Sequence, residues 1–98
     1  MAREFLVVHG IVQGVGYRHF VWRTALKFSI RGFVRNAEDG SVEILADAEP
    51  AMLKKFTEDI NVDFQNGPQV IGIVRDDKRL GEFEGKAFVE FTIEDLDQ

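Results

Sequence analysis

Gly10-Ile11-Val12-Gln13-Gly14-Val15-Gly16-Tyr17-Arg18 is the stretch from which the rest of this 98-residue chain can be interpreted. It follows an apolar run typical of a strand and leads into a run with helical spacing. Its glycines let the backbone adopt positive φ and turn N–H groups inward. A strand-to-helix turn of this kind presents a row of donors at the positive end of a helix, which suits an anion of phosphate size. Arg18 adds a permanent positive charge that can bind two phosphate oxygens at once.

The residues on either side of this loop predict a strand followed by a helix. Phe5–Val12 is rich in β-branched residues, and its alternation places Leu6 and Val8 on one face. After the loop the period changes, and apolar residues recur at helical spacing from Tyr17 to about Ser29. This stripe consists of Tyr17, Val21, Ala25 and Phe28, widened by Trp22 and Leu26.

The remaining sequence predicts more strands and a second helix. Ile30–Ala37 and Ser41–Ala46 alternate as strands around Asp39-Gly40, a pair that tolerates the positive φ of a tight hairpin. Pro50 suits the first turn of a helix, where its missing N–H has no consequence. The later segments are a helix with Leu53, Phe56 and Ile60 inside, strands at Val70–Val74 and Phe88–Ile93, and a charged surface connection over Arg75–Gly85.

The resulting order is β-α-β-β-α-β with one additional short strand. It predicts one α+β domain over residues 1–98, a ferredoxin-like sandwich with two helices on one face of a four- to five-stranded antiparallel sheet. In such a fold the first two strands run parallel with the third between them, so their C-terminal ends lie at the same edge. The first strand ends at the glycine loop and the second at Asn36, roughly 10 Å apart. We therefore expect a site between Arg18 and Asn36.

Composition and charge exclude several classes of function. The net charge of −5 disfavours nucleic-acid and anionic-membrane partners. The chain has no cysteine, which excludes disulfides, thiol nucleophiles and cysteine-ligated metals. It shows neither a signal-peptide pattern nor an apolar run of roughly 18 residues, so we expect a soluble cytoplasmic protein. We also expect it to be a monomer. The acidic residues Glu94, Asp95 and Asp97 are expected to be solvated charge without a role, and His9 and His19 to be structural or surface residues.

The groups expected at the site limit its chemistry. Loop N–H groups, the Arg18 guanidinium and the Asn36 amide include no obvious acid, base, nucleophile or metal cluster. Such a site could catalyse only a reaction whose leaving group departs without help. A mixed anhydride of a carboxylic acid and phosphoric acid meets this condition, because the leaving carboxylate has a pKa of about 4. The protein would then neutralise phosphoryl charge and orient a water, which the Asn36 amide can do without deprotonating it.

At these residues the sequence resembles the acylphosphatase family. The matching segments are Gly10–Arg18 and Gly32–Val42, in order and at the family's spacing, and the similarity in length and layout covers essentially the whole chain. It implies hydrolysis of small-molecule acyl phosphates to a carboxylate and orthophosphate, without a metal or cofactor. By position, Arg18 would bind the phosphate and Asn36 would hold the attacking water. A backbone cradle for phosphate or other anions would be formed by Gln13, Gly14, Val15, Gly16 and Tyr17.

Two other interpretations remain open. One is an acylphosphatase-like domain of the kind fused to hydrogenase-maturation carbamoyltransferases, which the short chain and the absence of zinc-finger cysteines disfavour. The other is a non-catalytic ferredoxin-like binding module, because Gly85–Phe91 is loosely similar to the aromatic strand of RNA-recognition modules. Its place on the last strand and the negative net charge favour an ordinary sheet strand.

Overall fold

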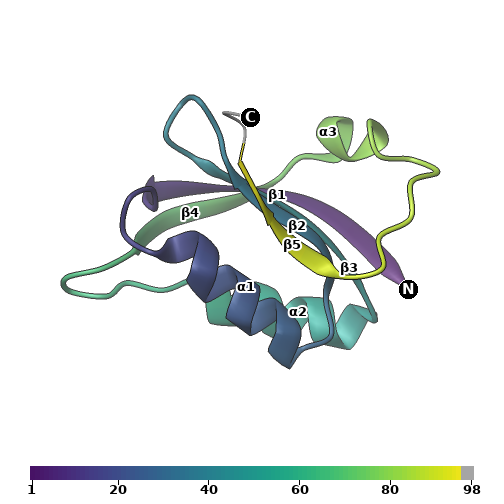
Figure 1. The fold of residues 1–98 in the computed structure, drawn as a ribbon, viewed down its shortest axis with the longest axis horizontal. Coiled ribbons are helices and arrows are strands. Elements are labelled where there is room, and N and C mark those ends of the chain that lie inside the picture. The colour runs from purple at the N-terminus through teal and green to yellow at the C-terminus, as the bar shows by residue number, and fades with distance from the viewer. Residues whose placement is uncertain (96–98) are drawn as a thin grey trace.

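The computed structural model describes residues 1–95 and forms the predicted ferredoxin-like sandwich. Helices α1 and α2 lie together on one face of a five-stranded sheet, and the short helix α3 lies on the opposite face (Figure 1). Within residues 1–95, none of the helices has the length and apolar character needed to cross a membrane. The elements are β1 (Ala2–Ile11), α1 (Tyr17–Lys27), β2 (Arg31–Asn36), β3 (Val42–Ala48), α2 (Pro50–Ile60), β4 (Gln69–Arg75), α3 (Asp77–Gly81) and β5 (Phe91–Glu94).

The strand order β4-β1-β3-β2-β5 places β3 between β1 and β2, as predicted. Both β1 and β2 pair with β3 in antiparallel fashion, so they run parallel to each other. Val8 and Asn36 are both register partners of Val42, which puts the three residues in one row across the sheet. The C-terminal ends of β1 and β2 therefore lie at the same edge. One detail differs from the predicted all-antiparallel sheet: β5 pairs with β2 in parallel, because the chain crosses from one edge of the sheet to the other before β5.

The sheet has an apolar core on each face. The larger core lies under α1 and α2 and includes the fully buried Val21 and Phe56. The smaller core, on the other face, consists of Phe5, Phe33 and Leu45. It is covered by side chains of α3 and the connection that follows: Leu80, Phe83 and Phe88.

Three sequence predictions need correction. The connection after β4 contains α3, which begins where the Asp76 side chain accepts a hydrogen bond from the Arg79 N–H at 3.0 Å. The last strand begins at Phe91 and not at Phe88, because the Phe88 ring packs against Phe33 in the smaller core. Leu26 is 52% exposed and does not widen the buried stripe of α1, since it borders an open groove beside the start of β5.

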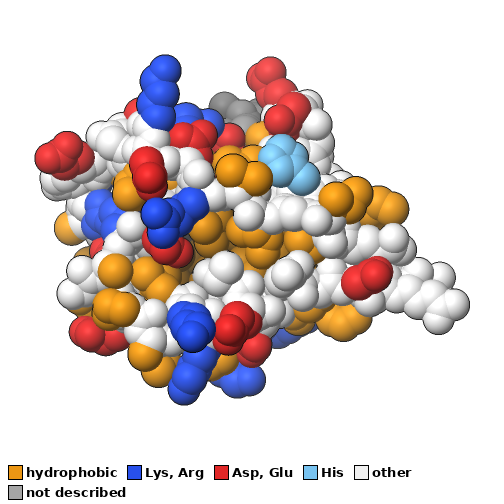
Figure 2. Space-filling model, turned by 180° about the vertical axis from the view of Figure 1, so that it is seen from behind, with side chains coloured by type: hydrophobic (Ala, Val, Ile, Leu, Met, Phe, Trp, Pro, Cys, Tyr) orange, Lys and Arg blue, Asp and Glu red, His pale blue; other side chains and the backbone are white. Residues whose placement is uncertain are grey.

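Charged side chains of both signs are interspersed on one face of the molecule (Figure 2). On the face shown in Figure 2, lysines and arginines alternate with acidic side chains and do not form a continuous basic patch. A phosphodiester backbone is bound through many neighbouring positive charges. This face therefore lacks the electrostatic pattern of a nucleic-acid interface.

Candidate active site

The loop between β1 and α1 presents main-chain donors at the sheet edge. Gly14 and Gly16 have φ of 74° and 79°, in the left-handed region that glycine adopts without strain. A Cβ at either position would meet nothing within 4 Å, so backbone conformation and not space requires glycine. Gly16 is the N-cap residue of α1, and no side chain within residues 1–95 caps the helix there. The first N–H groups of α1 thus keep their capacity to bind an anion.

Tyr17 contributes its main chain to the loop but not its hydroxyl. Its side chain is buried in the larger core, where the hydroxyl donates to the Ile60 carbonyl at 2.8 Å. Burial raises the pKa of this phenol well above its usual range, so it stays protonated. The contact ties the start of α1 to the end of α2 and helps to fix the position of the loop.

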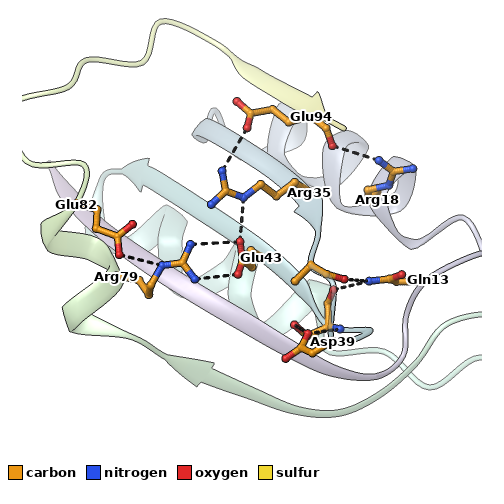
Figure 3. Close-up of polar contacts among 10 residues, drawn as sticks. Gln13, Arg18, Arg35, Asp39, Glu43, Arg79, Glu82 and Glu94 are labelled. Carbon is orange, nitrogen blue, oxygen red and sulfur yellow. Dashed lines mark hydrogen bonds and ion pairs between the residues drawn. The ribbon is translucent and has the colours of Figure 1, made fainter. Parts of the chain in front are cut away.

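Gln13 fastens the loop to the β2–β3 hairpin. Its Nε2 donates to the main-chain carbonyls of Ala37 and Ser41, both at 2.8 Å (Figure 3). The hairpin is itself closed by Asp39, whose carboxylate accepts from the Ser41 N–H at 2.9 Å. The sequence suggested only a main-chain role for Gln13, because the carbonyls it binds lie 24 and 28 residues further along the chain. The side chain therefore sets the spacing between the loop and Asn36.

The Gln13→Ala variant should lose this connection. Two hydrogen bonds at a partly buried place contribute about 1–3 kcal/mol together, so we expect the free energy of unfolding to fall by about that amount. We also expect weaker phosphate binding, since the loop would no longer be held against the hairpin. Urea denaturation and calorimetric titration with phosphate measure the two effects. Gln65→Ala, at an exposed position, is the control, and equal behaviour of the two variants would contradict this role.

The structure brings Arg18 and Asn36 together in one small cavity. The cavity has a volume of about 110 Å³ and is lined by Val12, Gly14, Gly16, Tyr17, Arg18, His19 and Asn36. Pockets that enclose drug-sized ligands measure roughly 300–1,000 Å³. This one suits a phosphoryl group with a water, and any organic group attached to it would extend outward. His19, expected at the surface, is exposed and also borders the cavity.

Asn36 lines this cavity and also carries a buried acceptor that no donor satisfies within residues 1–95. Its Oδ1 is buried and has no hydrogen-bond partner within residues 1–95. A buried carbonyl oxygen left without a donor is destabilising by about 1–3 kcal/mol. An unsatisfied buried oxygen calls for an explanation, and a bound water that donates to it is one that fits its place beside the cavity.

Arg18 is partly buried and contacts the end of β5. Its Nη1 donates to the Glu94 carbonyl at 3.2 Å and to Asp95 Oδ1 at 2.6 Å. This corrects the expectation that Asp95 is only solvated charge, whereas Asp97 lies outside the described residues. The sequence offered no signal for the contact, because it depends on where β5 joins the sheet.

An ion-pair network on the face of the sheet that α3 covers stabilises β2 next to Asn36. Arg35, the preceding residue, binds Glu43 at 2.9 Å and lies over the Phe33 ring at 4.7 Å. Glu43 is only 8% exposed, and it also binds Arg79 of α3 at 2.9 Å (Figure 3). A buried carboxylate between two guanidinium groups is well compensated and holds three elements in register. The network therefore holds the end of β2, where Asn36 lies, against β3.

The Gly14→Val variant tests the loop conformation. A β-branched residue at φ 74° is strained by roughly 1–3 kcal/mol, and the loop should relax away from its binding shape. We expect phosphate affinity to fall about tenfold or more while the fold persists, because a Cβ at this position meets nothing within 4 Å. Gly85→Val is the matched control, since Gly85 has φ 82° and the same open surroundings in the connection before β5. Unchanged phosphate affinity in Gly14→Val, measured by calorimetry, would contradict the cradle.

Comparison of the sequence and the fold with known proteins identifies relatives of this chain. A family model described as Acylphosphatase matches residues 4–92. The chain is 50% identical over 56 residues to an acylphosphatase of Pasteurella multocida, covering 57% of this chain and 62% of that protein, which is less than two thirds of it. It is 37% identical over 93 residues to an acylphosphatase of Pseudothermotoga lettingae, covering 95% and 98%. Its fold is similar to the crystal structure of acylphosphatase from Bacillus subtilis, with a TM-score of 0.76, 31% identity, and coverage of 96% and 99%.

Proposed function

The chain belongs to the acylphosphatase family, whose function is the hydrolysis of acyl phosphates, and we propose that it performs this reaction by attack of a water on phosphorus. The products are a carboxylate and orthophosphate. The observation that carries the proposal is the small cavity that Arg18 and Asn36 line together, where the buried Asn36 Oδ1 has no hydrogen-bond partner among residues 1–95. The Asn36 amide is suited to bind a water, and the loop N–H groups and the Arg18 guanidinium are suited to bind a phosphoryl anion.

The phosphoryl group binds to the loop and to Arg18. The N–H groups from Gly14 to Arg18 surround its oxygens at the N-terminus of α1, where the helix dipole favours negative charge. The Arg18 guanidinium neutralises the charge that the three peripheral oxygens carry as the bond to the acyl oxygen lengthens. These contacts hold phosphorus still and make it more susceptible to attack.

Asn36 places the attacking water. Its Oδ1 accepts one hydrogen bond from the water and directs the oxygen lone pair toward phosphorus. The water oxygen forms the new bond to phosphorus, while the acyl oxygen leaves with the electron pair of the broken bond as a carboxylate. The proton of the water passes to a phosphate oxygen. Because the leaving group has a pKa of about 4, it needs neither a general acid nor a metal ion.

Hydrolysis of benzoyl phosphate in H₂¹⁸O with excess EDTA tests this function. We expect turnover that survives the chelator, with the label found in orthophosphate and none in benzoate. Loss of turnover with EDTA would contradict the metal-independent reaction. Label in benzoate would show attack at the carbonyl carbon and not at phosphorus. The absence of turnover would support the alternative of a non-catalytic binding module.

A further inference from the structure

The end of β5 is fixed beside Arg18. Glu94 is the register partner of Arg35 in the parallel β2–β5 pair, and its carboxylate lies 3.7 Å from the Arg35 guanidinium. Its main-chain carbonyl accepts from Arg18 Nη1 at 3.2 Å (Figure 3). These two contacts hold the end of β5, so the next residue, Asp95, lies beside Arg18.

Asp95 forms an ion pair with the Arg18 guanidinium, which is the group that binds the phosphoryl oxygens in the proposed reaction. Its Oδ1 lies 2.6 Å from the same Nη1, and the Arg18 and Asp95 side chains are 29% and 57% exposed. A phosphoryl group bound to this guanidinium would add further negative charge a few ångströms from the carboxylate. Two anions that share one cation repel each other, and at a partly exposed site solvent weakens this repulsion without removing it.

We propose that Asp95 competes with the phosphoryl group for Arg18 and so sets how tightly the site holds substrate and product phosphate. The inference rests on the proposed function only in assigning the phosphoryl group to Arg18. When Asp95 is displaced or its charge removed, the Glu94 carbonyl still orients the guanidinium. The carboxylate opposes ground state and transition state alike, so it changes KM and product inhibition more than kcat.

The Asp95→Asn variant tests the proposal, because it keeps the shape of the side chain and removes its charge. We expect phosphate to bind about threefold to tenfold more tightly in calorimetric titrations. KM for benzoyl phosphate should fall by a similar factor, with kcat changed less than about twofold. Asp77→Asn is the control: it removes the same charge from α3, on the opposite face of the sheet, and should leave phosphate affinity unchanged.

The outcomes separate this inference from the proposed function. Weaker phosphate binding in Asp95→Asn would overturn the inference and show that Asp95 positions Arg18. An affinity equal to that of Asp77→Asn would also overturn it, and a proportional fall in kcat would assign Asp95 to the chemical step. In each of these cases the proposed function still holds if the wild-type protein binds phosphate and hydrolyses benzoyl phosphate. A wild-type protein that does neither would overturn both.

Discussion

Replacing Arg18 with alanine should abolish turnover and phosphate inhibition together. Arg18 lines the cavity together with Asn36, and the proposed reaction assigns the phosphoryl oxygens to its guanidinium. Removing a preorganised positive group from phosphoryl transfer lowers kcat/KM by roughly 10³-fold or more. Steady-state kinetics with benzoyl phosphate and calorimetric titration with phosphate measure the two losses.

A matched variant on the same helix separates this effect from a general loss of charge. Arg23 is exposed on α1, and Arg23→Ala changes the net charge by the same amount. We expect it to retain turnover and phosphate affinity. If Arg18→Ala still bound phosphate with wild-type affinity, the assignment of the phosphoryl group to Arg18 would be wrong.

Replacing Asn36 with alanine should have a different signature. We expect kcat to fall by roughly 10²- to 10³-fold, because the water loses the acceptor that orients it. Phosphate affinity should change by less than about threefold, since the loop and Arg18 remain. Kinetics with benzoyl phosphate and calorimetry with phosphate give the two numbers, and Asn66→Ala, in an exposed turn, is the control.

Thermal unfolding of Asn36→Ala adds an independent readout. The buried Asn36 Oδ1 has no partner in the described part of the chain, residues 1–95, so its removal relieves an unfavourable burial and should not lower Tm. A residue retained for stability would behave in the opposite way. Loss of phosphate binding with kcat preserved, or a large drop in Tm, would contradict the role given to Asn36.

The parts of this molecule that local pattern and topology determine could be predicted from the sequence. The change from strand alternation to helical spacing at Tyr17 predicted where α1 begins. The split βαβ topology then required β1 and β2 to run parallel, and the structure aligns Val8, Val42 and Asn36 in one row across the sheet. The proximity of Arg18 and Asn36 is a consequence of the fold and needed no knowledge of side-chain contacts.

The contacts that could not be predicted join residues far apart in the chain. Glu43 alternates like any solvent-facing strand residue, yet it is buried because Arg79, 36 positions later, is carried over it by α3. Asp95 looked like ordinary tail charge because nothing local shows that β5 will lie beside β2 and end next to Arg18. By contrast, α3 had a local signal, since Asp76 is a residue type favoured at the N-cap and lies directly before the first helical residue, Asp77.

A crystal structure of the complex with orthovanadate tests the central geometry most directly. Vanadate in a five-coordinate form has three equatorial oxygens and two apical ones, as the transferred phosphoryl group does during attack. We predict equatorial oxygens bound by the N–H groups of Gly14 to Arg18 and by the Arg18 guanidinium, and one apical oxygen within hydrogen-bond distance of Asn36 Oδ1. Vanadate bound elsewhere, or bound in the loop with Asn36 out of reach of both apical oxygens, would contradict the account.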